Sequence, residues 1–245
     1  PANRDKDTSR HEGAIREMYQ RMDALVRRVL DSLDDDTVLF VMSDHGFKPF
    51  RRGVNLNSWL HQNGLLATES PPDGEEWFRG VDWDRTQAYA VGLGGIYLNK
   101  QGREARGIVR SEEVAALKKR IIQGLEELED PVTGARAVAK VYDTAEAYAG
   151  PYVGEGPDLV AGFAVGYRAS WTNATGAVTS EVFEDNTRSW SGDHCMNPPD
   201  VPGILFCNRG LKEGSPSIMD LGPTVLDLFG VATPEYCDGR SLLPS

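Results

Sequence analysis

Two Asp-His pairs are the residues of this chain that are best suited to chemistry. Asp44 and His45 stand before a glycine, and Asp193 and His194 stand after one. Carboxylate and imidazole together suit a divalent metal ion of the zinc or manganese kind better than calcium. A single Asp-His pair is more often structural, because a histidine near a core can simply be hydrogen-bonded. Two such pairs, each close to a predicted strand, favour a metal site.

An unbroken apolar run leads into the first pair. Val38–Phe47 reads VLFVMSDHGF, and its apolar part shows no alternation. Such a run predicts a strand that is buried on both faces, as in the middle of a parallel sheet. The pair Asp44 and His45 would then lie just beyond the carboxyl end of that strand, where open α/β sheets keep their binding crevices. Gly46 would let the backbone turn sharply beside the two side chains.

Helices alternate with the predicted strands. The stretch Ser9–Glu12 has the form of a capping box, and apolar residues recur at helical spacing over Glu12–Leu33. Near the other end, the buried strand Gly203–Asn208 is followed by a helix over Leu221–Phe229. An amphipathic helix is expected over Ser111–Leu128. Strand-helix units of this kind are typical of α/β folds.

Length and composition fit one α/β domain over residues 1–245, in which residues 65–150 could form a cap or inserted subdomain. The formal net charge is −11, which disfavours nucleic-acid polymers and anionic membranes as partners. We find no apolar segment near the roughly 20 residues that a membrane span needs. The three cysteines match no zinc-finger or redox motif and suit a reducing compartment. We therefore expect a cytoplasmic protein.

Some other side chains could contact a substrate. Asn55 and Asn57 follow the first pair and could donate hydrogen bonds to a phosphoryl oxygen, although capping a short helix over residues 57–63 suits them better. The basic residues within 48–52 could attract an anion, although a solvated loop is the simpler interpretation. Trp171 and Trp190 could stack on an aromatic group or pack against the sheet.

The motifs resemble those of a known group of enzymes. SDHG at Ser43–Gly46, GDH at Gly192–His194, PGILF at Pro202–Phe206 and the closing DLGPTVLDLFGV at Asp220–Val231 are similar to motifs of the alkaline phosphatase superfamily. The nearest branch is the type I phosphodiesterase and nucleotide pyrophosphatase branch. The resemblance runs from about Glu12 to the end of the chain and is weakest over residues 65–150.

This resemblance implies a metal-dependent phosphohydrolase with two divalent metal ions, zinc first and manganese as the alternative. Asp44 and His45 would bind one ion and His194 the other, whereas Asp193 has no ligand role in the family pattern. The substrate would be a small phosphate ester, and this branch implies a diester rather than a monoester. The implied fold is α/β, with a largely parallel sheet and helices on both faces.

The resemblance also implies residues that precede SDHG. Members of the superfamily carry an early aspartate ligand, a Thr or Ser nucleophile, and a further Asp and His. Asp7 and His11 have the spacing of that last pair, although a solvated helix entrance explains them better, and Thr8 and Ser9 suit capping rather than nucleophilic attack. The catalytic nucleophile is therefore not assigned. We expect this chain to be the C-terminal portion of a larger enzyme, completed by an upstream segment.

Two other readings stay open. A phosphomutase or a sulfatase of the same superfamily would share the SDHG ligands, and a sulfatase would carry a modified Cys or Ser upstream. Alternatively, the chain could be a truncated relative without catalysis, which binds a metal ion or a partner. Substrate identity and oligomeric state do not follow from the sequence.

Overall fold

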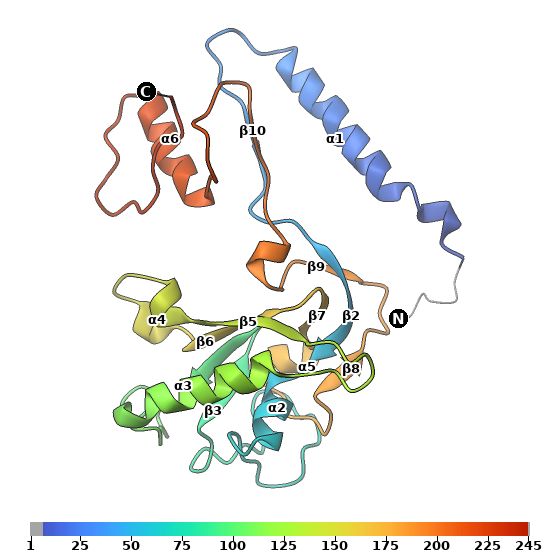
Figure 1. Ribbon diagram of the computed structural model, residues 1–245, viewed down its shortest axis with the longest axis vertical. Helices are drawn as coiled ribbons and strands as arrows, with labels where there is room; N and C mark the ends of the chain where they lie inside the picture. Colours follow the sequence, from blue (N-terminus) through green and yellow to red (C-terminus); the bar gives the residue numbers. More distant parts are fainter. Residues whose placement is uncertain (1–6, 245) are drawn as a thin grey trace. The chain divides into compact units, whose positions relative to one another are not determined.

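The fold is a mixed α/β arrangement of short elements (Figure 1). A computed structural model describes residues 7–244. The helices are α1 (Ala14–Leu30), α2 (Leu56–Gln62), α3 (Ser111–Glu126), α4 (Thr144–Ala147), α5 (Trp171–Ala174) and α6 (Leu221–Leu228). The strands are β1 (Phe40–Met42), β2 (Lys48–Val54), β3 (Ala88–Val91), β4 (Gly95–Leu98), β5 (Val138–Asp143), β6 (Leu159–Phe163), β7 (Gly166–Ala169), β8 (Phe183–Asp185), β9 (Gly192–Asp193) and β10 (Leu205–Cys207).

The chain divides into two compact units. Unit 1 is taken here as residues 47–201, and unit 2 as residues 7–46 together with residues 202–244. Residues 65–150 lie wholly in unit 1, where they supply β3, β4, α3, β5 and α4. The predicted single domain and the predicted cap both stay predictions.

One sheet of unit 1 has the order β3-β4-β6-β5, and every pair in it is antiparallel. A tight connection of three residues joins β3 to β4, and Gly92 and Gly94 adopt positive φ angles of 74° and 145° there. A side chain at Gly94 would also approach the carbonyl oxygen of Ala161 to 2.9 Å. Glycine is therefore needed at this turn both for its backbone conformation and for its lack of a side chain.

The other sheet of unit 1 has the order β7-β2-β8, with β9 also paired to β2. Among the pairs of named strands within residues 7–244, β2–β7 is the only parallel one; β8 and β9 run antiparallel to β2. The expectation of a largely parallel sheet is therefore wrong. An apolar run indicates that a strand is buried, but it does not indicate whether the neighbouring strand runs parallel or antiparallel to it.

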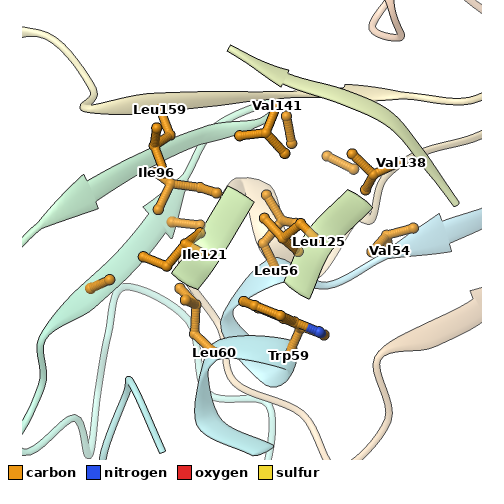
Figure 2. Packing of buried hydrophobic residues seen from close by; sticks show 14 of the residues in the cluster. Val54, Leu56, Trp59, Leu60, Ile96, Ile121, Leu125, Val138, Val141 and Leu159 are labelled. Carbon is orange, nitrogen blue, oxygen red and sulfur yellow. The ribbon is translucent and has the colours of Figure 1, made fainter. Parts of the chain in front are cut away.

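The core of unit 1 lies between the β3-β4-β6-β5 sheet and the helices α2 and α3 (Figure 2). Ile121 and Leu125 of α3 are fully buried there, as are Leu56 and Leu60 of α2. The predicted amphipathic helix is confirmed as α3, with its apolar stripe turned into this core. Each fully buried aliphatic side chain contributes about 1.5–3 kcal/mol by leaving water, so this core holds the sheet and both helices together.

Unit 2 contains a two-stranded antiparallel sheet of β1 and β10, in which Phe40 pairs with Cys207 and Met42 with Leu205. The strand predicted within Val38–Phe47 is present, and the SDHG motif follows its end. However, Phe40 and Val41 are only half-buried and Met42 is exposed, so burial on both faces is not observed. Among the described residues, β10 is the one strand that pairs with β1. A sheet of two strands covers less of each strand than the interior of a larger sheet would, so β1 stays partly exposed.

The first long helix is shorter than predicted. Glu12–Leu33 was the expected range, whereas α1 covers Ala14–Leu30 and follows a 3-10 turn over Ser9–His11. The capping box expected at Ser9 does not form, because Gly13 is the N-cap of α1 and no side chain caps the helix. None of the residues of α1 is buried, and no helix among residues 7–244 is both long and apolar enough to cross a bilayer.

Candidate metal-binding site

The turn that carries Asp44 and His45 is held by the chain that leads into β10. The backbone N–H of Ser43 donates to the carbonyl of Ile204 at 3.0 Å, and the N–H of Ile204 donates to Ser43 Oγ at 3.1 Å. A side chain at Gly203 would come within 2.3 Å of the Ser43 carbonyl oxygen. The close approach of these two segments therefore requires glycine at 203 and fixes the backbone just before the Asp-His pair.

Asp44 and His45 present their metal-ligating atoms side by side. Nδ1 of His45 lies 2.8 Å from the carbonyl oxygen of Gly46, which can only accept, so in the neutral ring Nδ1 carries the proton and Nε2 the lone pair. That Nε2 lies 3.6 Å from Asp44 Oδ1. Two ligands on one tetrahedral ion, each at about 2.0–2.2 Å, stand about 3.4 Å apart. The donor set and its spacing therefore fit one divalent ion of the zinc kind.

His194 lies in a tight turn that follows β9 in unit 1. The strand β9 pairs with β2 through Gly192 opposite Pro49 and Asp193 opposite Lys48. Within the turn, Asp193 Oδ1 accepts the backbone N–H of His194 at 2.7 Å and of Cys195 at 2.9 Å. One carboxylate oxygen thus ties together the two residues that follow it, as Asp side chains do in turns.

Asp193 stays ionised although it is buried. Burial by itself would raise the pKa of this carboxyl group, but the N–H of Cys195, the positive charge of Arg168 and the N–H of His194 together hold the pKa below its ordinary value. The guanidinium of Arg168 makes an ion pair with Asp193 Oδ2. Asp193 is therefore engaged on both oxygens, which suits a role in shaping the turn.

Asp193, His194 and Cys195 bring three possible ligand atoms within 4.8 Å of one another. Nδ1 of His194 lies 3.6 Å from Asp193 Oδ1, and its Nε2 lies 3.6 Å from Cys195 Sγ. Burial and the neighbouring carboxylate of Asp193 raise the pKa of Cys195 to about 11. Because the thiolate is the metal-binding form of cysteine, the imidazole of His194 is the better ligand in this group.

The predicted ligands lie in both units. Asp44 and His45 are neighbours in unit 2, and His194 is in unit 1, so their convergence on a common site stays a prediction. Asp7 and His11 lie at the exposed entrance to α1, where Asp7 Oδ1 accepts the N–H of Ser9 at 3.0 Å. This contact is typical of a capping turn, and a ligand role for the pair stays an untested alternative.

The two asparagines that could have reached a substrate are buried and bonded within unit 1. Asn55 caps α2, with its side-chain oxygen accepting the N–H of Ser58 at 3.0 Å. Asn57 is bonded to both backbone groups of Ala90 at 2.7 Å. Both side chains therefore have structural roles.

The tryptophans and the basic residues differ in their surroundings. The guanidinium groups of Arg168 and Arg188 lie 4.2 and 4.9 Å from the ring centroid of Trp171. Trp190 is exposed. Arg52 forms an ion pair with Asp130. Trp171 thus already has cationic partners over its ring.

A family profile decides the relationship of this chain to known proteins. The profile of the type I phosphodiesterase / nucleotide pyrophosphatase family matches residues 5–189. The chain belongs to this family. Among curated proteins, none gives a significant match to the chain. Membership supports a phosphoester hydrolase activity and confirms the resemblance seen in the motifs, and enzymes of this family typically depend on metal ions.

The family match divides the candidate ligands. Asp44 and His45 fall inside the matched residues, whereas His194 lies five residues beyond the end of the match at residue 189. The type I phosphodiesterase relationship therefore bears directly on the first pair. The metal role of His194 lies outside this match and stays a prediction.

The sequence did not reveal the role of Arg168, which pairs with Asp193 in the turn that carries His194. Arg168 lies in β7 and is only 3% exposed. The available signal was a charged residue inside the β-prone stretch Gly166–Ala169, because an arginine that becomes buried in a strand needs a carboxylate partner. Its partner Asp193 is 25 positions away, and only the fold brings the two together.

Proposed function

We propose that this chain supplies metal ligands to a phosphodiesterase-like site that hydrolyses a phosphate ester. Asp44 and His45 would bind one divalent metal ion and His194 the other. Zinc suits these nitrogen and oxygen ligands best, and manganese is the alternative. Two ions about 4 Å apart can stabilise the attacking and leaving oxygens during displacement at phosphorus, which is the chemistry that such a site would provide.

The observation that carries this proposal is the geometry of the first pair. Asp44 Oδ1 and His45 Nε2 lie 3.6 Å apart on a turn that directly follows a strand, within the part of the chain that matches the family. The carbonyl of Gly46 orients the imidazole, as partners of metal-binding histidines generally do.

The proposed substrate is a small phosphorylated molecule with a diester linkage. The net charge of −11 disfavours a polyanionic polymer as a substrate, because such partners select basic surfaces. A small anion remains compatible, since bound metal ions can reverse the local field.

In the complete enzyme we propose that a Thr or Ser from an upstream segment attacks phosphorus. A covalent intermediate would form on that side chain, and water would then release it. The remaining ligands would come from the same segment, or Asp7 and His11 would supply two of them.

Three alternative functions would give results that differ from those of this proposal. A phosphomutase would move phosphate within one substrate and release none, and a sulfatase would cleave a sulfate ester. A relative without catalysis would bind metal ions or a partner and turn over none of these substrates.

Elemental metal analysis of the purified chain, together with its intact mass, is the first test. About two equivalents of zinc or manganese would support a complete pair of sites, and one equivalent would support a partial one. The variants Asp44→Asn and His194→Ala should each lower the metal content, whereas His61→Gln should not, because that histidine lies in α2.

The substrate class needs a second test with the same variants. A chromogenic phosphodiester, a phosphomonoester and a sulfate ester should be compared on the metal-loaded complete enzyme, which includes the proposed upstream segment with the nucleophile. Preferred cleavage of the diester, lost in Asp44→Asn, is the expected result. Metal content unaffected by both ligand variants would contradict the proposal.

A further inference from the structure

Arg168 is a buried charge in unit 1. Its side chain is 4% exposed, and that of its partner Asp193 is 5% exposed. Nε of Arg168 donates to the carbonyl of Ala169 at 3.0 Å, and the rings of Phe50 and Trp171 lie 5.2 and 4.2 Å from the guanidinium carbon. An ion pair buried this deeply is costly unless its hydrogen bonds are complete, so it is weak evidence for stability alone.

The ion pair continues into the backbone that carries His194. Arg168 holds Oδ2 of Asp193, while Oδ1 of the same carboxylate accepts the N–H groups of His194 and Cys195. The guanidinium thereby anchors Oδ2 of the carboxylate, and Oδ1 of the carboxylate holds the first two amides of the turn. The direction in which the His194 side chain leaves the backbone follows from that turn.

The strands that carry these residues share a neighbour. Arg168 of β7 pairs with Gly53 of β2, and Asp193 of β9 pairs with Lys48 of the same strand. The turn is held again after His194, where the N–H of Met196 donates to the His194 carbonyl at 2.8 Å. The strands of unit 1 thus support the start of the turn, and a backbone hydrogen bond within the turn supports its end.

We propose that Arg168 is a positioning residue, which orients the imidazole of His194 towards its metal ion by holding Asp193. This inference rests on the proposed metal role of His194. Arg168 would not touch the metal ion or the substrate. Metal ligands are oriented by the partners around them, and loss of such a partner typically weakens metal affinity about 10–100-fold.

The test compares Arg168→Met and Arg168→Lys with the unchanged full chain. Zn²⁺ affinity is measured by competition with a chelating dye, and the ring ¹⁵N signals of the four histidines are followed by NMR. Arg168→Met should weaken Zn²⁺ binding by about tenfold or more and shift the His194 ring signals. Arg168→Lys should restore part of the affinity, since an ammonium group can still pair with Asp193.

Two controls separate positioning from loss of the fold. The ring signals of His61, which is bonded to the Leu66 carbonyl in unit 1, should stay unchanged in both variants. If Arg168→Met does not fold, the double variant Arg168→Met with Asp193→Asn removes the pair without leaving a buried charge unpaired. It should show the same loss of Zn²⁺ affinity.

The outcomes separate this inference from the proposed function. Weaker Zn²⁺ binding in His194→Ala but unchanged binding in a folded Arg168 variant would overturn the positioning role alone. Unchanged Zn²⁺ binding in His194→Ala would contradict the metal role of His194 and with it the inference. A loss of affinity accompanied by shifted His61 signals would mean that Arg168 serves only the fold, which also overturns it.

Discussion

The ring of Trp59 occupies the space that a side chain at Gly124 would need. A Cβ atom built on Gly124 would lie 2.7 Å from Cζ2 of Trp59, closer than real Cβ contacts. Gly124 is an interior residue of α3, and Trp59 of α2 is nearly buried against it. Replacing the helix glycine by alanine normally stabilises a helix by about 1 kcal/mol.

We expect the opposite sign for Gly124→Ala. Overpacking of this kind costs about 1–3 kcal/mol, which outweighs the gain in helix propensity. Urea unfolding should therefore show a lower midpoint. The control is Ala115→Gly at an exposed position of α3, which should cost about 1 kcal/mol through propensity alone. A Gly124→Ala protein more stable than the parent would contradict the packing described here.

Asn57 is expected to stabilise unit 1 through the backbone of β3. Its amide donates to the Ala90 carbonyl and accepts the Ala90 N–H, with all groups buried. Asn57→Ala would leave both backbone groups unsatisfied, at a cost of about 1–3 kcal/mol each. Chemical denaturation measures this loss, and the exposed Gln62→Ala on the same helix should change stability by about 0.5 kcal/mol at most. Equal effects of the two variants would argue against the Asn57 role.

Asp158 gives unit 1 a dependence on acidity. Burial would raise the pKa of Asp158, but Lys100, the N–H of Leu98 and Arg103 hold it below the ordinary value of 3.8. Oδ1 lies 2.7 Å from Lys100 Nζ, and Oδ2 lies 2.7 Å from a guanidinium nitrogen of Arg103. The unfolded chain therefore takes up the proton first as the pH falls.

The stability that Asp158 contributes should be complete above the ordinary pKa and should be lost as the pH falls through the lower folded-state pKa. Unfolding free energies measured from about pH 6 to about pH 3 should decline less steeply in Asp158→Asn than in the parent. At neutral pH this variant should lose about 3–5 kcal/mol, since the cations it leaves are partly buried. Parallel pH profiles for the two proteins would refute the assignment.

Asp44 and His45 should be dispensable for folding. Their side chains are 68% and 41% exposed, so truncation leaves no cavity. We expect Asp44→Ala or His45→Ala to abolish binding of one metal ion while changing the unfolding free energy of the metal-free chain by about 0.5 kcal/mol or less. Metal content and far-UV circular dichroism test both parts, with the exposed Asp31→Ala as the control. Unfolding without a change in metal content would contradict the prediction.

Local features of the sequence account for several of the helices and strands. The asparagine cap and the positive φ of Gly64 delimit α2 close to the range predicted for it. Helical spacing of apolar residues predicted α3, and the SDHG motif does follow a strand. These features depend on contacts between residues that are near one another in the chain, so a single sequence can reveal them.

The tertiary structure decided how the strands pair and what surrounds His194. The antiparallel ladders of unit 1 replace the expected parallel sheet, because a strand's own residues do not specify the direction of its partner. Asn57 meets Ala90, and Arg168 meets Asp193, across 33 and 25 positions of the chain. A lone buried charge or amide in a sequence shows that a partner is needed, and only the folded chain shows which one it is.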